Sequence, residues 1–301
     1  MTQPKTLSRR TFLLLSGAAA FVTAFPSKLP QALLDSITPI EPELIVGRAL
    51  GVVPVYEQPG ELAAVAGRIW PDNMTPIIDQ TGDWYTVADG YIRRSDLQPM
   101  LAYDQSAFPP IENLPVALTV IAPVTVVRRW VGTQAPPVTR IGYGGVLWAV
   151  DRLVDDNGQV WYGLAAEKNE TPLGWTRADH WAAVPLPLAE APQSDRELVL
   201  DRLQKQVVAR ENGQIVFSVP AVVPEHAQRH DVCIDGRNLA DSVAHYAGVP
   251  WRLGAAETVI YGAYWHNNFG QTADCAGWEV SPWAARWLYA WLPDGASVRV
   301  I

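Results

Sequence analysis

The sequence has no cluster of Lys or Arg beyond Arg10, and its formal net charge is -8 over 301 residues. Nucleic-acid binding needs a basic face, so this class of function is excluded. The chain also lacks a long apolar run, because residues 13–24 form a stretch too short to span a bilayer with ease. Cysteine is scarce, with only Cys233 and Cys275. The two could form one disulfide outside the cytoplasm, or Cys275 could be a reactive thiol.

What is present is the composition of a globular protein, with 49% hydrophobic and 18% charged residues and a length that suits two or three domains. The 25 Pro, 22 Gly and 13 Trp are typical of short strands joined by turns, with Trp in small β cores. We therefore expect a mainly β fold.

The N-terminus, residues 1–24, begins with polar residues, continues with Arg9 and Arg10, and ends in the apolar stretch. It resembles a twin-arginine export signal, with Val22 and Ala24 as small residues before a cleavage site. The resemblance implies a protein that works outside the cytoplasm, in the cell envelope or secreted. An uncleaved signal would be its only contact with the membrane.

Two segments read as small β modules. Residues 45–100 alternate in polarity between turns and close on a Trp-Tyr strand that begins at Trp84, and residues 114–185 repeat this order with Trp161. Both resemble bacterial SH3-like modules, and their aromatics are expected in the module cores. Proline-rich residues 25–44 and 185–194 are the predicted linkers.

The last segment, residues 196–301, opens with a predicted hairpin whose turn is 211–213. Residues 261–270 read YGAYWHNNFG, and the chain closes with a helix-like AARWLY and a strand-like SVRV. These phrases resemble the catalytic domain of the L,D-transpeptidases, which cross-link peptidoglycan. The resemblance implies a β-sandwich with a C-terminal helix.

The family's chemistry implies a Cys thiolate that attacks a peptide carbonyl, a His that takes the thiol proton, and backbone N–H groups that hold the oxyanion. These parts lie in a Ser-His-Gly-Cys motif. Counted without gaps, that motif falls on residues 274–277, which read DCAG, so Gly277 occupies the nucleophile position. The earlier His-Gly pair is Tyr261-Gly262. Acyl transfer is impossible on this alignment.

Shifted by two residues, the alignment places Cys275 on the nucleophile position, with His266 as a candidate base and Asp274 to orient it. The string DCAG also resembles the nucleophile turn of NlpC/P60 cysteine peptidases, but that family needs a downstream His, and the last His here is His266.

The spacing of several histidines would also suit a metal site. His226, His230 and Asp231 lie at i, i+4 and i+5, and Asp241 and His245 repeat an i, i+4 offset. Exposed polar loop residues are the favoured interpretation, so neither a metal nor a cofactor is expected. Two functions stay open: an acyltransferase that uses Cys275, and an inactive module that binds peptidoglycan.

Overall fold

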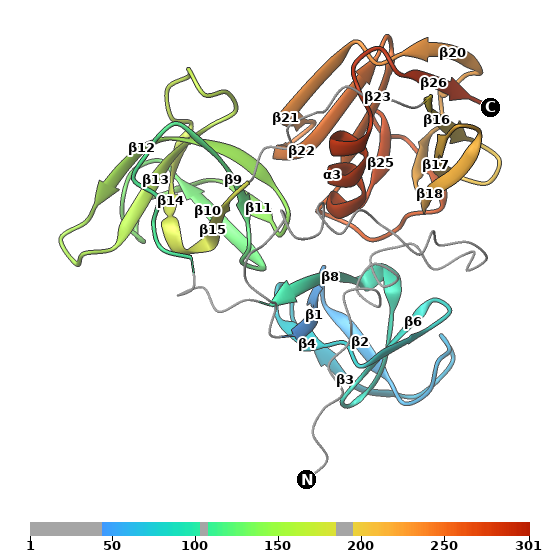
Figure 1. The fold of residues 1–301 in the computed structure, drawn as a ribbon. Coiled ribbons are helices and arrows are strands. Elements are labelled where there is room, and N and C mark those ends of the chain that lie inside the picture. Colours follow the sequence, from blue (N-terminus) through green and yellow to red (C-terminus); the bar gives the residue numbers. More distant parts are fainter. Residues whose placement is uncertain (1–43, 103–107, 185–194) are drawn as a thin grey trace.

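The computed structural model describes residues 44–102, 108–184 and 195–301. The predicted export signal and, apart from Leu44, both predicted linkers lie outside these residues. Within them the strands form three groups, coloured blue, green and orange to red in Figure 1. The mainly β fold predicted from composition is confirmed. No helix in the described parts is long and apolar enough to cross a membrane.

The first group consists of two small sheets around a compact core. Their strand orders are β4-β1-β8 and β3-β2-β7-β6-β5. The core includes Tyr85, Ile92 and Leu97, each 0% exposed. The elements are β1 (Leu44–Ala49), β2 (Val53–Tyr56), β3 (Val65–Ile69), β4 (Met74–Pro76), β5 (Asp79–Thr81), β6 (Trp84–Val87), β7 (Gly90–Arg93), η1 (Arg94–Asp96) and β8 (Leu97–Ala102).

The second group forms one seven-stranded sheet in the order β11-β10-β14-β13-β12-β9-β15. Trp161 and Tyr162 are buried within it. The description of both groups as SH3-like modules stays a prediction. The elements are β9 (Val116–Val120), β10 (Val124–Arg128), β11 (Pro137–Gly142), β12 (Val146–Val154), β13 (Val160–Ala165), β14 (Gly174–Arg177), η3 (Ala178–His180) and β15 (Trp181–Ala183).

The third group contains two sheets, ordered β18-β17-β16-β26-β20 and β21-β22-β23-β25-β19-β24, and the helix α3. The elements are β16 (Arg196–Asp201), β17 (Gln206–Glu211), β18 (Gln214–Pro220), β19 (Val222–Pro224), β20 (His230–Cys233), β21 (Gly236–Val243), β22 (Tyr246–Ala255), β23 (Thr258–Gly262), β24 (Gln271–Ala273), β25 (Trp278–Val280), α3 (Pro282–Trp291) and β26 (Ser297–Val300).

The predicted hairpin is the pair β17 and β18. Its turn residues Asn212 and Gly213 have φ values of 51° and 78°. Two positive φ angles in a two-residue turn match the right-handed twist of the strands, and Asn-Gly is the pair that adopts them at least cost. The turn therefore sets the register of the hairpin.

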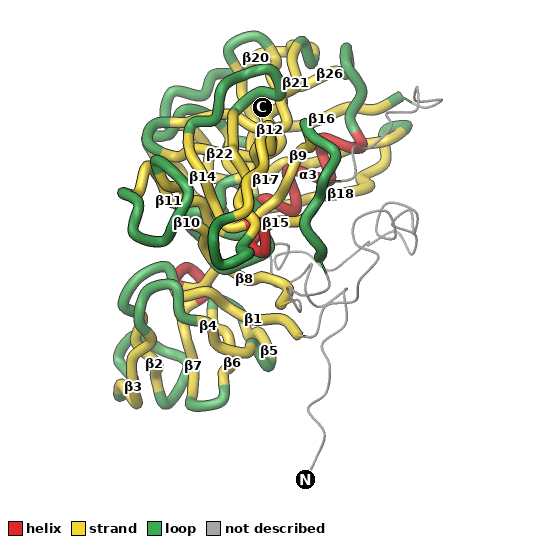
Figure 2. Tube along the Cα trace, turned by 90° about the vertical axis from the view of Figure 1, so that its left-hand side faces the viewer, coloured by secondary structure: helices red, strands yellow, loops and turns green. Residues whose placement is uncertain are grey.

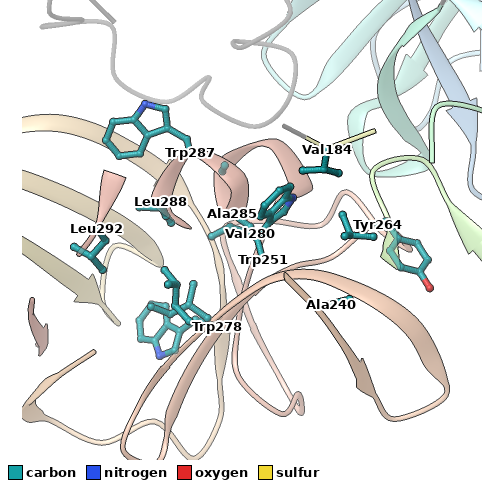
Figure 3. Packing of buried hydrophobic residues seen from close by; sticks show 14 of the residues in the cluster. Val184, Ala240, Trp251, Tyr264, Trp278, Val280, Ala285, Trp287, Leu288 and Leu292 are labelled. Atoms are coloured by element: carbon teal, nitrogen blue, oxygen red, sulfur yellow. The ribbon is translucent and has the colours of Figure 1, made fainter. Parts of the chain in front are cut away.

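Helix α3 begins at an N-cap residue, and its apolar face packs into the core. The hydroxyl of Ser281 accepts a hydrogen bond from the backbone N–H of Ala284 at 3.3 Å, and Pro282 follows the cap at the first helical position. The helix lies between the two sheets. There Trp287 stacks on Phe217 of β18, with the two ring centroids 4.4 Å apart. Figure 3 shows part of the buried cluster to which the helix belongs, with Trp251 and Val280 from the other sheet.

The three groups meet at the loop that follows β23. Arg48 of β1 donates from Nη2 to the carbonyl oxygen of Tyr264 at 2.9 Å, and Asp72 lies between Arg48 and Arg140 of β11. Figures 1 and 2 both place β8 on the side of the first group that faces the others.

The strongest link in this region is Asn267, whose side chain is only 2% exposed. Its Nδ2 donates to the carbonyl oxygens of Arg94 and Leu97, each at 2.9 Å, and lies 3.4 Å from the hydroxyl of Tyr85. The loop that bears His266 is thereby fixed to the first group.

Candidate functional site

The centre of the candidate site is a pair of neighbouring parallel strands, β23 and β25. Tyr261 and Glu279 are register partners, so their side chains lie on the same face of the sheet. Trp278 and Val280 alternate with Glu279 and enter the hydrophobic core on the opposite face. The Tyr261 hydroxyl donates to Glu279 Oε1 at 3.1 Å. Burial and then the charge of Glu279 raise the pKa of Tyr261 above its ordinary value, so the phenol keeps its proton.

His266 reaches the same carboxylate from the loop after β23. Its Nε2 lies 2.7 Å from Glu279 Oε2, and its Nδ1 accepts a hydrogen bond from the backbone N–H of Asn268 at 3.1 Å. A backbone N–H can only donate, so Nδ1 is the acceptor in its bond to Asn268. Both nitrogens of the imidazole are therefore already used.

Cys275 lies in the loop between β24 and β25 and is half-buried. Its thiol donates to the carbonyl oxygen of Gly277 at 3.2 Å. Burial, followed by the charge of Glu279, raises the pKa of Cys275 to about 12. Reactive cysteines lie beside positive charge, which stabilises the thiolate, whereas this thiol lies beside a carboxylate. The thiolate is strongly disfavoured at neutral pH.

The structure brings the three predicted site residues to one cavity of about 630 Å³, lined by Cys275, His266 and Asp274 together with Tyr261 and Glu279. Within the described residues no hydrogen bond joins His266 to the thiol or to Asp274, whose side chain is exposed. The catalytic roles assigned to these three residues stay predictions.

Glu279 is the residue that the sequence analysis missed. It is 6% exposed and accepts hydrogen bonds from both Tyr261 and His266. A single carboxylate between Trp278 and Val280 in an otherwise apolar strand was the available signal, since carboxylates are seldom buried without a partner.

Gly277, which the ungapped alignment places at the family's nucleophile position, has no room for a side chain. A Cβ there would lie 2.5 Å from the carbonyl oxygen of Val259 and 3.0 Å from Tyr261 Cε1. Gly262, the glycine of the earlier Tyr261-Gly262 pair, is similarly enclosed by Pro250 and Pro282. A cysteine at position 277 would therefore clash with backbone.

We expect Gly277→Ala to lower the free energy of unfolding by about 1–3 kcal/mol, because the added methyl group forces strands β23 and β25 apart. Urea denaturation followed by tryptophan fluorescence measures this loss. Gly236→Ala is the matched control, since a Cβ at Gly236 meets nothing within 4 Å. Equal stability of the two variants would contradict the steric argument.

The alternative of a disulfide is wrong, because Cys233 and Cys275 are both free. Cys233 is exposed at the end of β20, in the sheet that does not contain the cavity. The predicted loop residue His230 instead begins β20, and its Nε2 lies 2.7 Å from the hydroxyl of Thr258. No group of three or more His, Cys, Asp or Glu in the described segments could hold a metal.

Comparison with known proteins gives no match to a family model and none to a curated protein sequence. Solved structures do resemble the chain. One, from Stackebrandtia nassauensis, is 12% identical, with a TM-score of 0.32, over 38% of this chain and 58% of the other. A second, from Xylanimonas cellulosilytica, is 15% identical, with a TM-score of 0.32, over 39% and 65%. A third, from Mycobacterium smegmatis, is 14% identical, with a TM-score of 0.33, over 61% and 99%. All three are L,D-transpeptidases.

The family that the sequence resembles is thus also found among the similar solved structures. The chain spans less than two thirds of the length of the first two. At these identities and TM-scores, the similar structures assign no function to this chain.

Proposed function

We propose that this chain is an exported cell-envelope protein of L,D-transpeptidase type that binds peptidoglycan stem peptides without acyl transfer. The phrases in residues 196–301 that resemble the family support the choice of ligand. The absence of acyl transfer is inferred from Cys275. Its thiol donates to the carbonyl oxygen of Gly277, and its pKa is raised by burial and by the charge of Glu279. A thiol with no positioned base cannot form a thioester at a useful rate.

Further support comes from His266, the candidate base. Its imidazole is held by Glu279 and by the backbone N–H of Asn268, so neither nitrogen is available to the thiol. A cysteine peptidase of the NlpC/P60 type is not favoured by any contact, because among the described residues no hydrogen bond joins a histidine to Cys275, whose thiol donates to Gly277.

Two measurements on the protein without its export signal test this function. In the first, the protein sediments with insoluble peptidoglycan, and we expect it in the pellet. In the second, intact mass is recorded after incubation with imipenem, the compound bound in one of the similar L,D-transpeptidase structures. We expect no adduct, beside an active transpeptidase as positive control.

An imipenem adduct that disappears in Cys275→Ala would show a live nucleophile and would replace binding with acyl transfer as the function. Failure to sediment with peptidoglycan would overturn the proposed ligand.

A further inference from the structure

A chain of polar side chains crosses the interior of the second group of strands. Thr125 of β10 and Thr176 of β14 are both 0% exposed, and their hydroxyl oxygens lie 2.7 Å apart. On one side of this pair, Nδ1 of His180 in η3 lies 2.9 Å from Thr125 Oγ1. On the other side, the indole Nε1 of Trp181 in β15 donates to Thr176 Oγ1 at 3.5 Å. The chain therefore connects β10, β14, η3 and β15.

The direction of these hydrogen bonds is set at the Trp181 end, because an indole N–H can only donate. If Thr125 donated to Thr176 as well, the Thr176 hydrogen would have no acceptor within residues 44–102, 108–184 and 195–301. Thr176 therefore donates to Thr125, and Thr125 donates to Nδ1 of His180. In this arrangement every hydrogen of the chain has an acceptor, and Nδ1 carries no proton.

Protonation of His180 is incompatible with this arrangement. An imidazolium donates from both nitrogens, so Nδ1 would donate to Thr125, and Thr125 would turn its hydrogen back to Thr176. The hydroxyl hydrogen of Thr176 would then be buried without an acceptor. A buried donor that loses its acceptor destabilises the fold.

The charged groups that act on the ring are Asp179 of the same η3 turn and Arg177 of β14. Burial is the main cause that lowers the pKa of His180, while Asp179 raises it and Arg177 lowers it. Asp179 already accepts from Nε of Arg177 at 3.1 Å, and His180 Nε2 lies 3.9 Å from the same oxygen. The fold thus favours the neutral imidazole. Its contribution to stability is complete above the ordinary pKa of about 6.5 and is lost as the pH falls below that value.

The loss falls on the contact between β10 and β14. Arg128, the last residue of β10, is the register partner of Trp175. Nearer the start of β10, the hydroxyls of Thr125 and Thr176 join the two strands. On its other side β10 pairs with β11 to form a hairpin. Without the hydroxyl chain, this hairpin is less firmly held to the rest of its sheet.

The same hairpin contacts the first group of strands. Arg140 of β11 donates to Asp72. Tyr143, which follows β11, accepts from Gln98 Nε2 at its carbonyl oxygen, at 3.1 Å, and its hydroxyl accepts from the backbone N–H of Leu101 at 3.3 Å. A hairpin that loosens at β14 therefore also loosens these contacts.

We propose that His180 is a pH sensor that controls how firmly the first group is attached. In acid, the imidazolium breaks the hydroxyl chain, the contact between β10 and β14 opens, and the β10–β11 hairpin releases the first group. The sensor lies outside the candidate cavity, and its action goes beyond the proposed function. An exported protein, as proposed above, is exposed to the pH of its surroundings.

Hydrogen exchange of the full chain, measured by mass spectrometry at pH 7.5 and pH 5.0, tests this sensor. After correction for the intrinsic exchange rates, we expect the protection of residues 124–143 to fall at least about fivefold at pH 5.0, because a buried hydroxyl without a partner costs that much or more. Residues 97–102 should lose protection with them, since the Leu101 N–H is bound to Tyr143.

His180→Asn retains a side-chain oxygen near the position of Nδ1 but cannot gain a charge, so it should keep its protection at pH 5.0. His226→Asn is the matched control. It changes an exposed histidine of the third group and should lose protection as the wild type does. If His180→Asn does not fold, Thr125→Val replaces it. This variant lacks the hydroxyl, so it should be less protected already at pH 7.5 and lose less on acidification.

Equal protection of the wild type at the two pH values would overturn the inference. A loss of wild-type size in His180→Asn, or in Thr125→Val, would contradict the role of the hydroxyl chain. A loss confined to residues 124–143 would overturn the effect on the first group.

Discussion

Iodoacetamide should modify Cys233 at pH 7.5 about a hundredfold faster than it modifies Cys275. Cys233 is exposed, whereas a pKa of about 12 leaves Cys275 with a thiolate fraction roughly a thousandfold below that of a free cysteine in water. The higher intrinsic nucleophilicity of a more basic thiolate recovers part of that difference. Half-burial of Cys275 slows the reaction further.

The raised pKa of Cys275 also determines how its alkylation rate depends on pH. Because the thiolate fraction of Cys275 rises about tenfold per pH unit until its pKa is approached, the alkylation rate should climb without a plateau from pH 7 to pH 10. Cys233→Ser isolates the reaction at Cys275, and intact mass measures it. In the same background, Glu279→Gln should accelerate alkylation, since it removes the second cause of the raised pKa. A plateau below pH 9 would show an activated thiol and would support catalysis.

Asn267→Ala should detach the loop after β23 from the first group of strands. The side chain donates to two carbonyl oxygens across the interface, those of Arg94 and Leu97. The Arg94 carbonyl oxygen still accepts from the backbone N–H of Leu97, whereas the Leu97 carbonyl oxygen loses the Asn267 donor. A buried acceptor that loses its donor costs about 1–3 kcal/mol, so the free energy of unfolding should fall by about that amount. Urea denaturation measures this change.

The matched control for this substitution is Asn268→Ala. Asn268 is the next residue and its side chain is exposed, while its backbone N–H to His266 is retained. Asn268→Ala should unfold at nearly the urea concentration of the wild type. Equal effects at the two positions would mean that the Asn267 contacts do not hold the interface.

Local features of the fold could be predicted from the sequence, because their causes lie within a few residues. The Asn212-Gly213 pair predicts the turn between β17 and β18, and the helix-like phrase near the end becomes α3. The mainly β character followed from composition for the same reason.

The candidate site could be predicted only in part. Cys275, His266 and Asp274 do line one cavity, but the residue that organises it, Glu279, was missed. Its contact with Tyr261 depends on the parallel pairing of β23 with β25, which joins residues 18 positions apart. The contact of Asn267 with Leu97 spans 170 positions. No short-range pattern encodes such contacts, and the sequence also left open a disulfide that the structure excludes.

The two neighbours His266 and Asn267 have a consequence for communication within the molecule. His266 is held by Glu279 in the cavity, and Asn267 is held by Leu97 of the first group of strands. The same loop therefore contacts both the cavity and the first group. Thermodynamic linkage makes such coupling reciprocal. Any coupling between the cavity and the first group of strands would pass through these two adjacent residues.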